Sequence, residues 1–192
     1  MKQITFYLDF ISPYAWLAFN ELPRTLMGLS YSVQYRPVLL GALLKHNAML
    51  GPAEVPSKRE WIYRHVRWMA RQQDVVLDLP AVHPFNPLGL LRLAVATDPQ
   101  GFPNRYVCET LFRHVWEGGG DAADSQRLAT VSSQLAPARH PGSDAVKAQL
   151  KSHADAAIAL GVFGVPSFVV DNEVFWGVES LPMLRECVIA AV

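Results

Sequence analysis

Sequence typical of β-strands lies near the two ends of this 192-residue chain, and roughly 110 residues between them carry no strand signal. Residues 4–10 predict a buried strand because they are rich in β-branched and aromatic side chains, and residues 30–37 alternate well enough to form a second one. Near the other end, residues 167–170 and 174–176 flank a turn at 171–173 and predict a hairpin. Any sheet must therefore be assembled from segments far apart in the sequence.

A helix is predicted between the first two strands. Ser12 is a typical N-cap residue, and Pro13 suits the first helical turn. An apolar stripe follows as far as Leu22. A strand, a helix and a strand in such close succession indicate two parallel strands joined by a right-handed βαβ unit.

The middle of the chain is predicted to be helical. Residues 57–60 read Ser-Lys-Arg-Glu, a capping box that would open a long helix ending near Gln73. Asn86 and Pro87 would open another helix, ending near Thr97. Four more helical segments are expected, at residues 103–116, 124–135, 143–160 and, after the last strand, 181–191.

This order of elements predicts an α/β fold, a thioredoxin-like core with an all-helical domain inserted after the second strand. Residues 1–37 and 161–192 would form the core, and residues 38–160 the helical insertion domain.

Composition and charge exclude several classes of function. Seventeen basic and seventeen acidic side chains cancel, so no net field attracts nucleic acid or an anionic membrane. No uninterrupted apolar stretch is long enough to cross a bilayer. Cys108 and Cys187 form neither a CxxC pair nor part of a metal-ligand cluster, and two buried thiols are expected. Without a secretory signal, the expected location is the cytoplasm, where thiols stay reduced.

The first candidate motif is Asp-Phe-Ile-Ser-Pro-Tyr at residues 9–14. It places the hydroxyl of Ser12 where a parallel strand ends and a helix begins, which is where α/β sheets bind ligands. Free backbone N–H groups and the helix dipole there favour an anion, including a thiolate. A serine cannot do redox chemistry, but it can donate a hydrogen bond to a sulfur anion. On this segment alone, a simple helix cap is the better interpretation.

The second motif is Gly-Val-Phe-Gly-Val-Pro-Ser at residues 161–167. A proline just before an edge strand, after two glycines, predicts a cis peptide bond between Val165 and Pro166. In a thioredoxin-type core this loop faces the N-terminus of the first helix. The backbone N–H and C=O of Val165 would then pair with an extended peptide as a short added strand.

The third motif, Trp-Gly-Val-Glu-Ser-Leu at residues 176–181, joins the last strand to the last helix. Its helix N-terminal amides, carboxylate and hydroxyl suit the charged end of a γ-glutamyl group. Glu179 and Ser180 could equally serve only as helix caps, and the sequence does not separate the two interpretations.

Five polar residues of the middle segment lie near expected helix ends: Lys45, Asn47, Lys58, His83 and Asn86. A cationic side chain over a cleft could hold a substrate carboxylate, although most such charges are solvated. For Asn86, which precedes Pro87, a helix cap is the better interpretation than a ligand.

Taken together, residues 9–14, 36–41, 163–168 and 175–177 resemble the 2-hydroxychromene-2-carboxylate isomerase family, over nearly the whole chain. That family is related to kappa-class glutathione transferases and bacterial disulfide oxidoreductases. The resemblance implies glutathione as cofactor, a homodimer, and Ser12 acting on the glutathione sulfur. Lys58 and Val165 would contact glutathione, as would the stretch Trp176, Gly177, Val178 and Glu179. Lys45 and Asn86 would contact the second substrate. No metal is implied.

Two positions depart from the family pattern. Glu179-Ser180 stands where the family commonly has Asp-Arg, and Ala48-Met49 where it commonly has Gly-Asn. The expected activity is a glutathione-dependent cis–trans isomerisation of an aromatic keto or enol acid. A kappa-type glutathione transferase and a non-catalytic glutathione-binding protein remain as alternatives.

Overall fold

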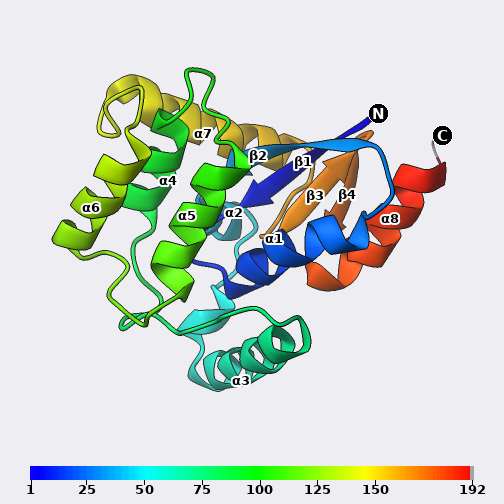
Figure 1. Ribbon diagram of the computed structural model, residues 1–192, viewed down its shortest axis with the longest axis horizontal. Coiled ribbons are helices and arrows are strands. Elements are labelled where there is room, and N and C mark those ends of the chain that lie inside the picture. The colour runs from blue at the N-terminus through cyan, green and yellow to red at the C-terminus, as the bar shows by residue number, and fades with distance from the viewer. Residues whose placement is uncertain (191–192) are drawn as a thin grey trace.

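A four-stranded mixed sheet with the order β2-β1-β3-β4 lies at the centre of the computed structural model, which describes residues 1–190 (Figure 1). β1 (Lys2–Leu8) pairs in parallel with β2 (Tyr31–Pro37) and antiparallel with β3 (Ser167–Val170). β4 (Glu173–Trp176) completes the sheet through an antiparallel hairpin with β3. The predicted order of strands along the chain and the parallel pairing of the first two are confirmed.

The end of the first strand was placed two residues too late. Asp9 and Phe10 belong to the turn after β1, because the pairing with β2 ends at Leu8 opposite Pro37. The final hairpin turn is also tighter than expected, since Val170 pairs directly with Glu173.

Helices cover both faces of the sheet, and two short 3-10 helices join them. The elements between β2 and β3 are α2 (Leu40–His46), η1 (Pro52–Glu54), α3 (Pro56–Gln72), α4 (Leu88–Ala96), α5 (Arg105–Trp116), α6 (Ser125–Leu135) and α7 (Asp144–Ala159). The other helices are α1 (Pro13–Thr25), η2 (Val178–Ser180) and α8 (Leu181–Ala190). Residue 191, which the prediction placed in the last helix, and residue 192 of the predicted core lie outside the described residues.

Two helix predictions need correction. The proposed capping box at Ser57 does not form, because α3 begins one residue earlier at Pro56 and its N-cap, Val55, has no capping side chain. The helix α2 was not predicted. It is short and starts without a side-chain cap, so its local sequence carries little signal.

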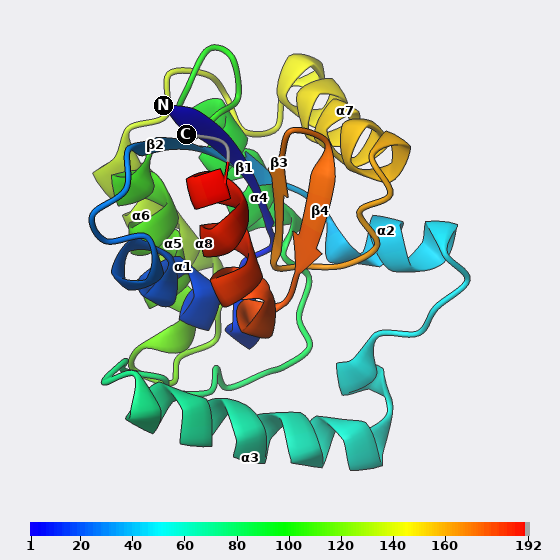
Figure 2. The same cartoon turned by 90° about the vertical axis from the view of Figure 1, so that its right-hand side faces the viewer.

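Side chains alternate between two apolar clusters on opposite faces of the sheet, as the period of a β-strand requires. On β1, Phe6 and Leu8 pack into a large cluster with α1, α5 and α8, whereas Tyr7 packs with α2 and α7. Figure 2 shows α1 and α8 on one side of the sheet and α2 and α7 on the other.

The large cluster unites the sheet with the helical part of the chain. Phe112 of α5 is fully buried, with ring centroids 5.0 Å from Phe10, 5.6 Å from Trp16 and 5.3 Å from Phe19. Helical and core segments therefore share one hydrophobic interior, and the division at residues 37 and 160 stays a prediction.

The three candidate motifs meet at one end of the sheet. Tyr7 pairs with Ser167, which pairs with Trp176. Because β3 runs antiparallel to both neighbours, the residues after β1, before β3 and after β4 leave the sheet at the same end. Figure 2 shows α3 passing beneath this end.

The peptide bond between Val165 and Pro166 is cis, as predicted. A second cis bond joins His83 and Pro84 and was not predicted. Among the described residues, no helix has the length and apolar character needed to cross a membrane.

Replacing Phe112 with alanine is expected to lower the free energy of unfolding by about 3–5 kcal/mol, because it removes a fully buried ring from an aromatic cluster. Denaturant unfolding followed by fluorescence measures this change. Tyr106→Ala on the same helix is the matched control, since Tyr106 is 59% exposed and its loss should cost less than about 0.5 kcal/mol. Equal effects of the two variants would contradict this description of the core.

Candidate functional site

Ser12 occupies the N-cap of α1, as predicted. Its Oγ accepts a hydrogen bond from the Ala15 N–H at 3.2 Å, and Pro13 occupies the first helical position. The residue is 6% exposed. A serine hydroxyl can accept and donate at once. Since the Oγ donates to no group among residues 1–190, its hydrogen remains free for a ligand.

Asp9, the first residue after β1, has a fully buried carboxylate that was not predicted as a site residue. Its Oδ1 accepts from the Ile11 N–H at 3.2 Å, and its Oδ2 accepts from the Leu40 N–H at 2.8 Å. Burial raises the pKa of Asp9 from 3.8 to about 7, although the hydrogen bonds from Leu40, Ile11 and Phe10 lower it in part. This side chain ties the turn before Ser12 to the first residue of α2.

Two further side chains hold the carbonyl groups of the turn. The Trp116 indole N–H donates to the Phe10 oxygen at 2.9 Å, and the His83 Nε2 lies 2.9 Å from the Ile11 oxygen. His83 was noted in the sequence as a polar residue near a helix end, but its contact with Ile11 spans 72 residues and has no local signal.

The loop before β3 leaves its backbone available at Val165. Neither the N–H nor the C=O of this residue makes a hydrogen bond within the described part of the chain. Its neighbours are held: the Ser167 hydroxyl donates to the Gly164 oxygen at 2.8 Å, and the Gly177 N–H donates to the Pro166 oxygen at 2.9 Å. The loop is thus fixed to the segment after β4.

The segment after β4 depends on Gly177, whose φ of +90° suits glycine. A Cβ there would lie 2.7 Å from the Glu179 carboxylate, which therefore folds back over the glycine. The Ser180 hydroxyl donates to the Gly177 oxygen at 2.8 Å and closes the turn that precedes α8. Trp176 is 48% exposed and lies beside Phe163 with ring centroids 5.0 Å apart.

Glu179 faces the N-terminal part of α1. Burial raises the pKa of Tyr14, and the Glu179 charge raises it further. The Tyr14 hydroxyl lies 2.9 Å from the His65 Nδ1 on α3. Glu179, α1 and α3 therefore surround the same end of the sheet as Ser12.

The candidate residues of the middle segment are placed differently. Lys58, in the first turn of α3, and Lys45, at the end of α2, are exposed and form no ion pair among residues 1–190. The Asn86 Oδ1 accepts from the Leu88 N–H at 3.1 Å in a turn before α4, whose N-cap position is occupied by Pro87. None of the three makes a hydrogen bond with Ser12 or Val165. Ala48, where the family commonly has glycine, has a φ of +52°.

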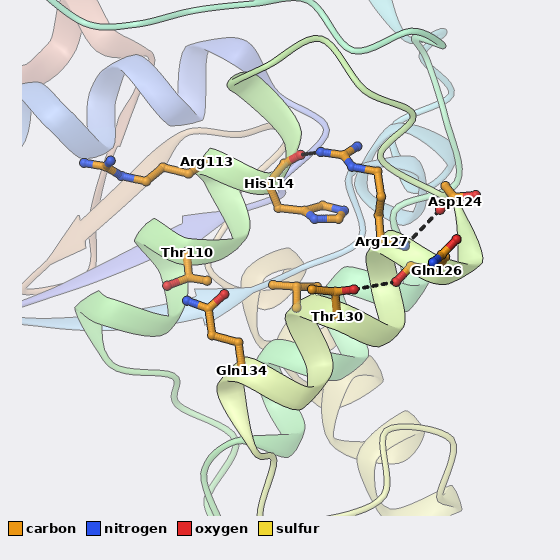
Figure 3. A pocket seen from close by; sticks show the side chains of 9 residues that line it. Thr110, Arg113, His114, Asp124, Gln126, Arg127, Thr130 and Gln134 are labelled. Carbon is orange, nitrogen blue, oxygen red and sulfur yellow. Dashed lines mark hydrogen bonds between the residues drawn. The ribbon is translucent and has the colours of Figure 1, made fainter.

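One surface groove lies elsewhere, between α5 and α6, and has a volume of about 530 Å³ (Figure 3). Both arginines of its lining already have partners. Arg127 donates to the His114 oxygen at 2.8 Å, and Arg113 pairs with Glu109 at 2.9 Å. No residue predicted for the functional site lines this groove, so the turn at Ser12 remains the candidate site.

A family model for the DSBA-like thioredoxin domain matches residues 3–188. This chain belongs to the DSBA-like thioredoxin family. Among solved structures, the chain resembles that of a 2-hydroxychromene-2-carboxylate isomerase, with a TM-score of 0.84 and 22% identity. The match covers 98% of this chain and 95% of that one. The chain also resembles a cytosolic disulfide reductase from Pseudomonas aeruginosa with a TM-score of 0.62 and 12% identity, covering 99% and 100% of the two chains. These likenesses confirm the predicted fold.

Named relatives confirm the resemblance seen in the motifs. The chain is 26% identical to 2-hydroxychromene-2-carboxylate isomerase of Sphingobium xenophagum, over 96% of both chains. It is 28% identical to the Pseudomonas putida enzyme of that name, over 95% of this chain and 92% of the relative. Glutathione S-transferase kappa 1 of Rattus norvegicus is 25% identical, over 95% and 89%. The chain is thus similar to isomerases and to kappa-class transferases.

The raised pKa of Asp9 predicts a specific dependence of stability on pH. The folded state holds a proton between pH 3.8 and about 7 that the unfolded state releases. The free energy of unfolding should therefore fall as pH rises through this range, by roughly 4 kcal/mol, and level off above it. Asp9→Asn cannot titrate, so its unfolding free energy should lack this fall.

Urea unfolding of both proteins from pH 4 to 8 measures the difference, which cancels contributions from other titrating groups. A wild-type protein and an Asp9→Asn variant with parallel pH profiles would show that Asp9 has an ordinary pKa.

Proposed function

We propose that this protein is a glutathione-dependent enzyme. It would catalyse the cis–trans isomerisation of 2-hydroxychromene-2-carboxylate or a similar aromatic keto or enol acid. One observation carries the proposal: Ser12 and Val165 both lie at the same end of the sheet. Ser12 offers a hydroxyl whose hydrogen is free, and Val165 offers a backbone N–H and C=O without partners among residues 1–190. The names of the similar isomerases and kappa-class transferases support the same chemistry.

Ser12 and the start of α1 suit a sulfur anion. The first helical N–H groups have no partners inside a helix, and the helix dipole favours negative charge at this end. The Ser12 hydroxyl adds a donor that becomes stronger when the acceptor is ionised. Together these groups would lower the pKa of a bound thiol.

Val165 and the segment after β4 suit the rest of the tripeptide. The free N–H and C=O of Val165 would pair with the glutathione backbone as a short added strand. The Glu179 carboxylate would hold the γ-glutamyl amino group, flanked by Trp176, Gly177 and Val178, and Lys58 would pair with a glutathione carboxylate. The site therefore fits the group that the resemblance implies.

Glutathione, when bound, supplies a thiolate that adds reversibly to the substrate double bond, so that rotation becomes possible before the thiol is eliminated. Ser12 would stabilise the sulfur whenever it carries negative charge. Lys45 and Asn86 would orient the carboxylate and hydroxyl of the second substrate. A cytoplasmic location, expected without a secretory signal, and a homodimer, implied by the resemblance, belong to this proposal.

A kappa-type transferase would use the same site and release a conjugate. Consumption of glutathione separates the two activities, because an isomerase regenerates it and a transferase does not. A non-catalytic binding protein would bind glutathione and turn over neither kind of substrate. Thiol–disulfide exchange has little support, since the turn carries a serine and Cys108 is fully buried.

Ser12→Ala is expected to lower kcat/KM with 2-hydroxychromene-2-carboxylate by one or more orders of magnitude while the protein stays folded, because a lost cap costs only ~1 kcal/mol. Ser143→Ala is the matched control: Ser143 caps α7 and accepts from the Val146 N–H at 3.4 Å. The two variants should lose similar stability, and only Ser12→Ala should lose activity. Full activity in Ser12→Ala would reduce Ser12 to a helix cap.

Glu179→Ala is expected to weaken glutathione binding by roughly tenfold or more, because a charge-assisted hydrogen bond contributes about 1.5–3 kcal/mol. Isothermal titration calorimetry measures the dissociation constant directly. Glu186→Ala, which removes an exposed carboxylate from α8, should leave it unchanged. Unaltered affinity in Glu179→Ala would refute the assignment of this carboxylate to the γ-glutamyl end.

A further inference from the structure

The peptide unit between Ile11 and Ser12 is held at both of its ends. Its carbonyl oxygen lies 2.9 Å from the His83 Nε2, and its N–H donates to the Asp9 carbonyl at 3.1 Å. The orientation of this peptide plane sets the backbone φ of Ser12, and with it the direction of the hydroxyl. His83 therefore acts on the candidate site from outside it.

The preceding peptide unit is held in the same way. The Phe10 oxygen accepts from Trp116 at 2.9 Å, and the Ile11 N–H donates to the Asp9 carboxylate at 3.2 Å. The rings of His83 and Trp116 are in edge contact, with centroids 5.5 Å apart. One packed pair of side chains thus holds consecutive carbonyl groups before Ser12.

Tyr63 of α3 fixes the orientation of the imidazole. Its hydroxyl lies 2.8 Å from the His83 Nδ1 and 3.1 Å from the His83 carbonyl oxygen. A carbonyl oxygen only accepts hydrogen bonds, so the His83 Nε2 must carry a hydrogen and donate it to the Ile11 oxygen. In the neutral ring the Tyr63 hydroxyl donates to Nδ1. In the protonated ring Nδ1 donates to Tyr63, and the hydroxyl turns to the carbonyl.

The contact with Ile11 therefore survives either protonation state of the ring. Burial lowers the pKa of His83, the hydrogen bond to Ile11 raises it in part, and the nearby Arg59 charge lowers it again, so the net shift is downward. The neutral state is favoured, and the hydroxyl of Tyr63 then defines which nitrogen carries the proton.

We propose that His83, aligned by Tyr63, is a positioning residue that orients the Ile11–Ser12 peptide and thereby aims the Ser12 hydroxyl at the bound anion. This inference rests on the proposed function for the role of Ser12. It also links the site to α3, the helix that carries Tyr63 and the candidate ligand Lys58.

Three variants test the proposal. His83→Leu removes the donor to Ile11. His83→Gln retains an N–H that reaches the Nε2 position. His114→Leu is the matched control, because the His114 Nε2 lies 3.1 Å from the Ala122 oxygen and burial likewise lowers the pKa of His114, yet it borders the groove of Figure 3.

The first measurement is amide hydrogen exchange of Ser12 by NMR in the protein without glutathione. His83→Leu should accelerate this exchange about tenfold or more, corresponding to about 1.4 kcal/mol of lost local stability. His83→Gln should restore slow exchange, and His114→Leu should leave it unchanged. Equal exchange in His83→Leu and wild type would overturn the proposal.

The second measurement is isomerase kinetics. His83→Leu should lower kcat by roughly ten- to hundredfold, the cost of a misplaced catalytic group, with a smaller change in KM. His83→Gln should recover most of the activity. If His114→Leu loses as much activity, or if glutamine fails to rescue, His83 has only a general structural role.

Tyr63→Phe keeps the imidazole and removes its aligning hydroxyl, so it tests the proposal even if His83→Leu does not fold. It should accelerate Ser12 exchange less than His83→Leu does, and unchanged exchange would remove Tyr63 from the proposal. If the wild-type protein binds no glutathione, the proposed function fails, whereas the exchange measurement still decides the role of His83.

Discussion

The buried carboxylate of Asp9 holds the turn on which the proposed function depends. No cation pairs with it among the described residues, and two backbone amides, from Ile11 and Leu40, supply its hydrogen bonds at 3.2 and 2.8 Å. Removing a carboxylate from water is costly unless such partners exist. By accepting from both amides, this side chain joins the starts of the two connections that follow β1 and β2.

The position of Ser12 follows from this turn. Asp9, Trp116 and His83 hold the backbone at residues 9–12, so that α1 begins where the sheet ends. The first N–H groups of α1 therefore lie at the same end of the sheet as the loop with the cis bond at Pro166. A thiol at this position would allow redox chemistry in such a fold. A serine instead offers a donor that cannot be oxidised, which suits holding a sulfur anion that belongs to another molecule.

Local sequence was sufficient to predict the features that depend on neighbouring residues. The cap at Ser12, the cis bond at Pro166 and the final hairpin each follow from a few consecutive residues, and the alternation of apolar side chains placed the strands. The helix α2 and the true start of α3 were missed, because neither has a side-chain cap at its N-terminus.

The contacts of Asp9 with Leu40 and of His83 with Ile11 span 31 and 72 residues, so only the folded chain brings them together. The binding roles predicted for Lys45, Lys58 and Asn86 remain predictions, because a ligand and not the chain itself would join these residues to Ser12.

The proposed chemistry depends most on stabilisation of a thiolate by this turn. Ultraviolet absorbance of glutathione bound to the wild-type protein, followed against pH, measures the pKa of its thiol directly. The structure predicts a value at least about one unit below that of an ordinary cysteine thiol near 8.5. A bound thiol that titrates at the same pH as free glutathione would contradict the claim.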